Sequence, residues 1–115
     1  MNRDEKQANL LNKIKLSRHE TTVENVVLRL LESGRYDVVC KHHNYSSPLG
    51  SGELDILAEV ETPTGRHSHY YEIKCTDSRS SINKAIKQYH RFQKTHPELH
   101  TQGIYVTPTR IRRLR

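Results

Sequence analysis

The sequence predicts one domain of the α/β class. Two segments carry apolar residues at helical spacing, and four segments are rich in strand-forming residues. In chain order these are a helix at residues 21–33, strands at 35–43, 54–60 and 70–75, a helix at 80–96 and a strand at 102–107. A chain of 115 residues has room for a single modest core. The mixed order of helices and strands is typical of an α/β domain.

The first helix has clear end signals. Residues 1–19 are polar and highly charged, and they either form a short amphipathic helix or stay frayed. Thr21 and Glu24 form a capping-box pattern, which predicts that the helix begins at Thr21. It runs to Ser33 and ends at Gly34. Glu24 has two rival roles, because it can reach back to the backbone of Thr21 or point across to the sheet.

Strands at 54–60 and 70–75 predict an antiparallel hairpin. Pro63 and Gly65 stand at the second and fourth positions of the turn between them, which suits a type I turn. Because strand side chains alternate, one face of the first strand is apolar and suited to a core. That face carries Leu54, Ile56 and Ala58.

Four charged residues lie on the opposite face of this hairpin: Glu53, Asp55, Glu72 and Lys74. A turn centred on the Pro63–Thr64 bond places Asp55 directly across from Glu72, and Lys74 follows two residues later. A bulge at Gly65 would instead shift this register by one residue, so the shared face is the firmer prediction. Like charges that face each other destabilise a sheet. A bound cation reverses that effect, because Mg²⁺ takes oxygen ligands from one or two carboxylates. The alternative is an ordinary solvated strand face with weak surface ion pairs.

The remaining segments offer weaker signals. Residues 44–51 predict a loop at the mouth of this site, where Ser46, Ser47 and Ser51 could contact a substrate or simply form turns. The helix at 80–96 has one apolar stripe and a cationic face that could follow a phosphate backbone or stay solvated. After the last strand, residues 109–115 form a basic tail that predicts a phosphate-binding or disordered end.

Composition favours an intracellular protein that binds a polyanion. The net charge is +6 and the pI about 9.5, which predicts nucleic acid as the first candidate partner without separating DNA from RNA. Neither a membrane-spanning apolar run nor the apolar core of a signal peptide is present, so we expect a cytoplasmic or other intracellular location, with nucleoid or nuclear association possible. Cys40 and Cys75 fit free structural thiols in strands. The histidines lack zinc-ligand spacing.

The hairpin residues carry a resemblance to a known superfamily. Gly52-Glu53-Leu54-Asp55-Ile56-Leu57-Ala58, followed by Tyr70-Tyr71-Glu72-Ile73-Lys74, resembles the active-site signature of the PD-(D/E)XK nucleases, in the branch of small resolvase-like and phage or viral nucleases. The resemblance covers residues 21–107. Leu54 stands where the name-giving proline would be. The resemblance implies a restriction-endonuclease-like core, a four-stranded mixed sheet flanked by helices in the order αβββαβ. The domain would span residues 20–108.

The resemblance also implies site residues. Asp55 and Glu72 match the metal-binding acids, Lys74 matches the basic residue of the ExK triplet, and Glu24 matches the additional helical acid. The carbonyl of Ile73 would be a further metal ligand. Gln88 and Tyr89 resemble the glutamine-containing helix that places the substrate. The expected nucleic-acid contacts are Gln88, Tyr89, Lys84, Lys87, Arg91 and Ser51.

These residues together predict a Mg²⁺-dependent endonuclease that hydrolyses DNA phosphodiester bonds, with Mn²⁺ as a substitute ion. Junctions or other branched DNA are candidate substrates, with a role in repair or recombination. A junction resolvase needs one active site for each strand, which would make the protein a homodimer. Two alternatives stay open: a non-catalytic nucleic-acid-binding module of the same fold, and an RNA-processing nuclease.

Overall fold

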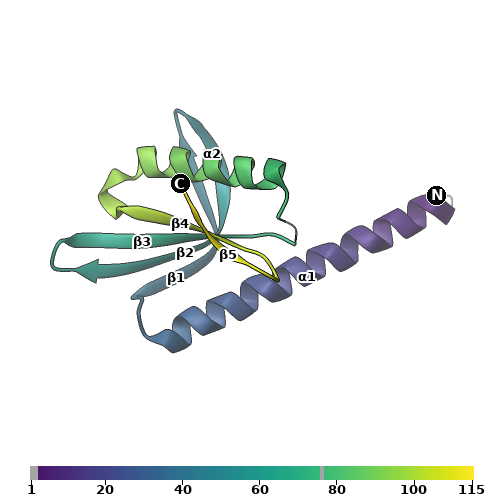
Figure 1. The fold of residues 1–115 in the computed structure, drawn as a ribbon, viewed down its shortest axis with the longest axis horizontal. Coiled ribbons are helices and arrows are strands. Elements are labelled where there is room, and N and C mark those ends of the chain that lie inside the picture. Colours follow the sequence, from purple (N-terminus) through teal and green to yellow (C-terminus); the bar gives the residue numbers. More distant parts are fainter. Residues whose placement is uncertain (1–2, 76) are drawn as a thin grey trace.

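A central five-stranded sheet separates two helices. The computed structural model describes residues 3–75 and 77–115. The strands are β1 (Val38–Ser47), β2 (Gly50–Thr62), β3 (Gly65–Ile73), β4 (Thr101–Val106) and β5 (Ile111–Leu114), in that spatial order. Helix α1 (Arg3–Ser33) lies on one face and α2 (Arg79–Thr95) on the other (Figure 1). The predicted α/β class is confirmed.

The sheet is mixed, because one strand pair is parallel. β3 and β4 run parallel and are joined through α2 and the short 3₁₀ helix η1 (Pro97–Leu99), whereas the other neighbouring pairs are antiparallel. The predicted four strands become five, because β5 forms within the predicted basic tail. Leu114 is 4% exposed and packs over Gly103, where an added Cβ would lie 2.9 Å from the Cβ of Leu114. This non-local contact holds an arginine-rich segment as a strand.

Helix α1 is much longer than predicted. It begins at Arg3 and passes through Thr21 without a cap, so the capping-box interpretation was wrong. Residues 3–33 contain no Gly or Pro, and nothing in this segment breaks the helix before Gly34, which ends it as predicted at φ 67°. The N-terminal half of α1 projects beyond the sheet (Figure 1). In the described part of the chain, neither α1 nor α2 is long and apolar enough to cross a membrane.

The predicted loop at residues 44–51 is the end of a second hairpin. β1 continues to Ser47 and β2 begins at Gly50, so only two residues form the turn. Tyr45 is buried and meets Phe92 of α2 edge to face, at 5.5 Å between ring centroids. That contact holds the strand against α2, so the polar Ser- and Gly-rich composition did not produce a loop.

Each face of the sheet has its own apolar cluster. Leu54 and Leu57 pack with α2, whereas Ile56 packs with Val23 of α1. The prediction that Leu54 and Ile56 share one core face was therefore wrong. The regular alternation of side chains along β2 is interrupted near Asp55, since Leu54 and Leu57 belong to the same cluster. On the neighbouring strand β1, His42 has a positive φ of 53°. Since both faces are covered by a helix, neither face of β2 is the solvated one.

Helix α2 follows its prediction closely. Ser78 caps its N-terminus by accepting a hydrogen bond from the backbone N–H of Ser81. Ala85, Tyr89 and Phe92 of the predicted stripe are buried.

The two cysteines are free thiols. Cys40 lies in β1 and is partly buried. β3 ends at Ile73, so Cys75 lies outside the strand and is exposed, contrary to the predicted strand position.

Candidate active site

The β2–β3 hairpin brings the two predicted acids together. The register runs from Thr62↔Gly65 to Ile56↔Tyr71, so Asp55 and Glu72 each lie one residue beyond the last described pair. Their carboxyl groups lie close enough to interact electrostatically. Asp55 is 9% and Glu72 is 5% exposed.

Burial and the neighbouring charge of Asp55 strongly raise the pKa of Glu72. Desolvation and then the charge of Asp55 raise this pKa to about 8, while nearby Lys74 opposes the shift. Asp55 Oδ2 also accepts a hydrogen bond of 2.8 Å from the backbone N–H of Ile73. We therefore assign the proton of the metal-free pair to Glu72 at neutral pH.

Lys74 and Gln88 complete the surroundings of Glu72. Lys74 Nζ lies 3.5 Å from Glu72 Oε1, and its side chain is 44% exposed. Gln88 Nε2 donates to Glu72 Oε2 at 3.1 Å and lies 2.8 Å from the hydroxyl of Tyr70. A cavity of about 200 Å³ opens here, and Glu72, Lys74, Lys84 and Gln88 contribute to its lining. One acid of the pair thus faces a solvent-accessible cavity with two lysines.

His19 is a site residue that sequence reasoning missed. Its Nε2 lies 2.9 Å from the carbonyl oxygen of Ile73 and 3.4 Å from Asp55 Oδ2. An N–H at Nε2 therefore donates toward the two oxygen groups expected to bind a metal. His19 lies one turn before the buried Val23 on the inner stripe of α1. Extending the helix upstream of Thr21 would have revealed this position.

The structure does not bring Glu24 to the two acids. Glu24 forms an ion pair with Lys41 on the surface, and both side chains are nearly half exposed. Because α1 continues through Thr21, Glu24 does not cap the helix. Its side chain does reach the sheet, but it meets Lys41 of β1 and not the two acids. Glu20 instead lies next to His19, and its Oε1 is 2.9 Å from His42 Nε2.

His42 joins two glutamates beside the site. Its Nδ1 lies 2.7 Å from Glu53 Oε1, opposite its contact with Glu20. Hydrogen bonds to Glu20 and then Glu53 raise the pKa of His42. Both ring nitrogens face carboxylates, an arrangement that suits the imidazolium form.

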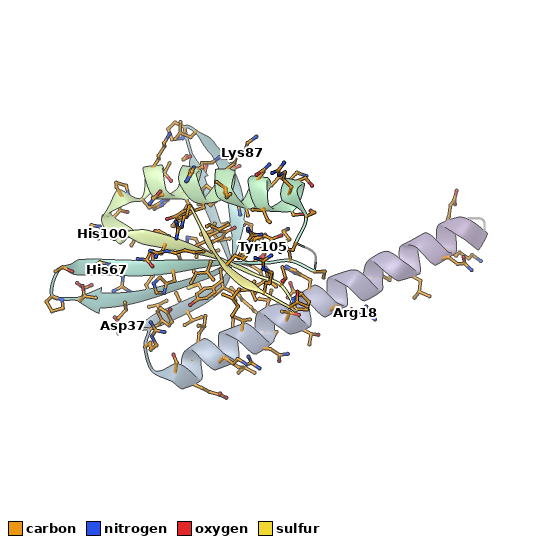
Figure 2. All side chains as sticks on the ribbon, viewed as in Figure 1. Arg18, Asp37, His67, Lys87, His100 and Tyr105 are labelled. Atoms are coloured by element: carbon orange, nitrogen blue, oxygen red, sulfur yellow. The ribbon has the colours of Figure 1, made fainter. Side chains whose placement is uncertain are left out.

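The predicted nucleic-acid contacts separate into four groups. Gln88 and Lys84 line the cavity, whereas Lys87 is exposed on α2 (Figure 2). Tyr89 is 7% exposed and donates to the carbonyl of Thr101, so it is a core residue and is not available to a ligand. Arg91 donates to the backbone oxygen of Ser51 at 3.3 Å, which places both at the β1–β2 hairpin.

The donor set fits a hard divalent cation with an incomplete protein shell. Asp55, Glu72 and the Ile73 carbonyl supply oxygen ligands, and Mg²⁺ usually takes one or two carboxylates while water and phosphate complete its octahedron. Within residues 3–75 and 77–115, no three His, Cys, Asp or Glu side chains are grouped closely enough to hold a metal by themselves. A bound cation would also reduce the repulsion between the carboxylates of Asp55 and Glu72.

Comparison with protein-family models, curated proteins and solved structures finds no match to this chain.

Proposed function

We propose that the chain is a metal-dependent nuclease of the PD-(D/E)XK type that hydrolyses DNA phosphodiester bonds. The observation that carries this proposal is the buried Asp55–Glu72 pair next to the partly exposed ammonium of Lys74. The order of α1, β1, β2, β3, α2 and β4 is the order that the resemblance implies, with β5 as an addition.

Each site residue has a defined part in this chemistry. Asp55, Glu72 and the Ile73 carbonyl would hold the ion, which lowers the pKa of bound water and offsets phosphate charge. Lys74 supplies a fixed positive charge where negative charge develops on the phosphate. The hydrogen bond from Gln88 fixes the orientation of the Glu72 carboxyl group. His19 fixes Asp55 and the Ile73 carbonyl from the helix side.

A cleavage assay tests the proposal. The substrates are a four-way junction, a flap, a nicked duplex, a single strand and an RNA of matched sequence, each with Mg²⁺ or Mn²⁺. We expect cleavage of at least one DNA substrate, and loss by about 10²-fold or more in Asp55→Asn and Lys74→Ala. Glu24→Gln is the matched control, because its carboxylate lies on the surface with Lys41. Unchanged cleavage in folded Asp55→Asn would exclude this site.

A non-catalytic nucleic-acid-binding module is the second candidate. It is favoured by the lack of a three-residue metal cluster among the described side chains. Calorimetry with Mn²⁺ separates the two, because a nuclease of this type binds the ion at millimolar concentration and the module does not. Preferred cleavage of the RNA would instead support an RNA-processing role.

A further inference from the structure

The α1 side of the sheet carries an open surface over its last two strands. α1 packs mainly on β1, β2 and β3, so much of β4 and β5 on this side is not covered by a helix. Ile111 of β5 is 77% exposed here. The surface is hollowed, and the hollows lie outside the active-site cavity.

Three adjoining hollows form one trough along this surface. The first, of about 280 Å³, and the second, of about 570 Å³, share Ile111. The second and the third, of about 480 Å³, share Thr22 and Pro108. We call the combined feature the arginine trough, since six arginines contribute to its lining: Arg18, Arg29, Arg35, Arg110, Arg112 and Arg113.

The charge of the arginine trough is of one sign. No Asp or Glu is among the described residues that line it. Asp77 pairs with Arg110 and Arg112, at 3.2 Å each. Within the described residues, Arg29 and Arg113 form no ion pair with any carboxylate. A concave surface with unpaired guanidinium groups favours an anion, and guanidinium groups match phosphate geometry.

The two ends of the trough differ in chemistry. The first hollow contains Tyr36 and Tyr71, whose hydroxyls are 2.9 Å apart, together with His69. Aromatic rings beside arginines are the combination that single-stranded nucleic acid binds, because bases stack on rings while phosphates meet cations. The third hollow ends at Arg18 and Cys75. Arg18 precedes His19 on α1, near the point where this helix leaves the sheet (Figure 2), and Cys75 follows Lys74.

The geometry points to a single-stranded segment of nucleic acid as the ligand of the arginine trough, held through its phosphates and led toward the Asp55–Glu72 pair. This inference rests on the proposed nuclease function for the direction of the strand. Hollows of 280 to 570 Å³ are in or near the size range of small-ligand sites, which suits the single nucleotide units of one strand. An acidic peptide would satisfy the arginines but would leave the aromatic end without a stacking partner.

Binding measured without metal tests the inference separately from cleavage. A fluorescent poly-dT strand and a duplex of equal length are titrated in EDTA at several salt concentrations, with anisotropy as the readout. The test variant is Arg29→Gln/Arg113→Gln. The control is Arg66→Gln/Lys94→Gln, which removes the same charge from the β2–β3 hairpin and the end of α2. Arg113→Glu is a second variant, and melting curves check that each protein is folded.

We expect the test variant to bind the strand about tenfold or more weakly, with the control close to the wild type. The slope of log K against log salt should become less negative by about 1.4, since each lost phosphate contact on a single strand changes it by about 0.7. Arg113→Glu should weaken binding of the strand more than the control variant does, although both lower the net charge by two. Equal losses in the test and control variants, or tighter arginine-dependent binding of the duplex, would overturn the inference. Arginine-dependent binding without any cleavage would support the trough as a binding site and contradict the proposed nuclease function. Cleavage with binding that does not depend on these arginines would support the nuclease function and contradict the trough.

Discussion

The metal-free protein should lose stability as the pH rises from about 4.5 to about 8, and Glu72→Gln should remove most of that loss. Burial beside Asp55 raises the pKa of Glu72 from 4.5 to about 8. Between these values the folded protein keeps the proton that the unfolded chain has released, so raising the pH favours unfolding. Each pKa unit corresponds to about 1.4 kcal/mol. The shift therefore amounts to a loss of up to about 5 kcal/mol, a large part of the stability of a small domain.

Urea unfolding followed by circular dichroism measures this effect. The free energy of unfolding is determined in EDTA at intervals between about pH 5 and about pH 8 for the wild type, Glu72→Gln and the control Glu32→Gln. Other titrating groups largely cancel in the difference between wild type and variant. Exposed Glu32 on α1 controls for the loss of a carboxylate in general. Added Mg²⁺ should restore the wild type near pH 8 and leave Glu72→Gln little changed, because the ion binds the ionised pair. Parallel pH profiles for wild type and Glu72→Gln would refute the reasoning.

Three further predictions concern the residues around the pair. His19→Ala should lower the cleavage rate or the metal affinity by about 10- to 100-fold with the fold intact, because it removes the group that orients Asp55 and the Ile73 carbonyl. Calorimetry with Mn²⁺ measures the affinity, and an unchanged affinity and rate would contradict this role. Gly52→Ala should destabilise the protein by about 1–3 kcal/mol and reduce cleavage, since the added Cβ would lie 2.9 Å from Gln88 Oε1. Urea unfolding tests this, and an unchanged free energy of unfolding would show that Gln88 moves freely. NMR titration should give His42 a pKa above its ordinary value, because two glutamates bond to it, and His69 a pKa below, because it is buried near arginines; the reverse order would contradict both assignments.

The features that could be predicted from sequence depend on local signals. Pro63 and Gly65 specify the turn of the β2–β3 hairpin, and the turn sets the register that runs up to the neighbours of Asp55 and Glu72. Helix α2 has a stripe of the right period and is followed by Pro97, so its bounds were predicted to within one residue. In both cases the residues that decide the structure lie within one element or its turn.

The features that were missed depend on contacts far along the chain. β5 was hidden by its arginines, because the burial of Leu114 depends on a glycine in β4. The true length of α1 was hidden by a capping-box pattern at Thr21, which a helix can pass through when no breaker precedes it. His19 was missed for the same reason, since its position on the inner stripe of α1 exists only in the longer helix. The sequence therefore predicted the candidate residues on the sheet but not the one on the helix.

The Asp55–Glu72 pair is the point where local rules and the fold disagree most. Two like-charged groups face each other in a sheet, almost fully buried, and an apolar pair of similar size would avoid both the desolvation and the repulsion. The neighbouring groups do not remove this cost, because Lys74 is partly exposed and the metal-free pair still needs a proton. A divalent cation would remove it, since it converts the repulsion into shared coordination. Because proteins tend to break local rules at functional sites, this conflict supports a ligand-dependent role for the pair more strongly than its position in a motif does.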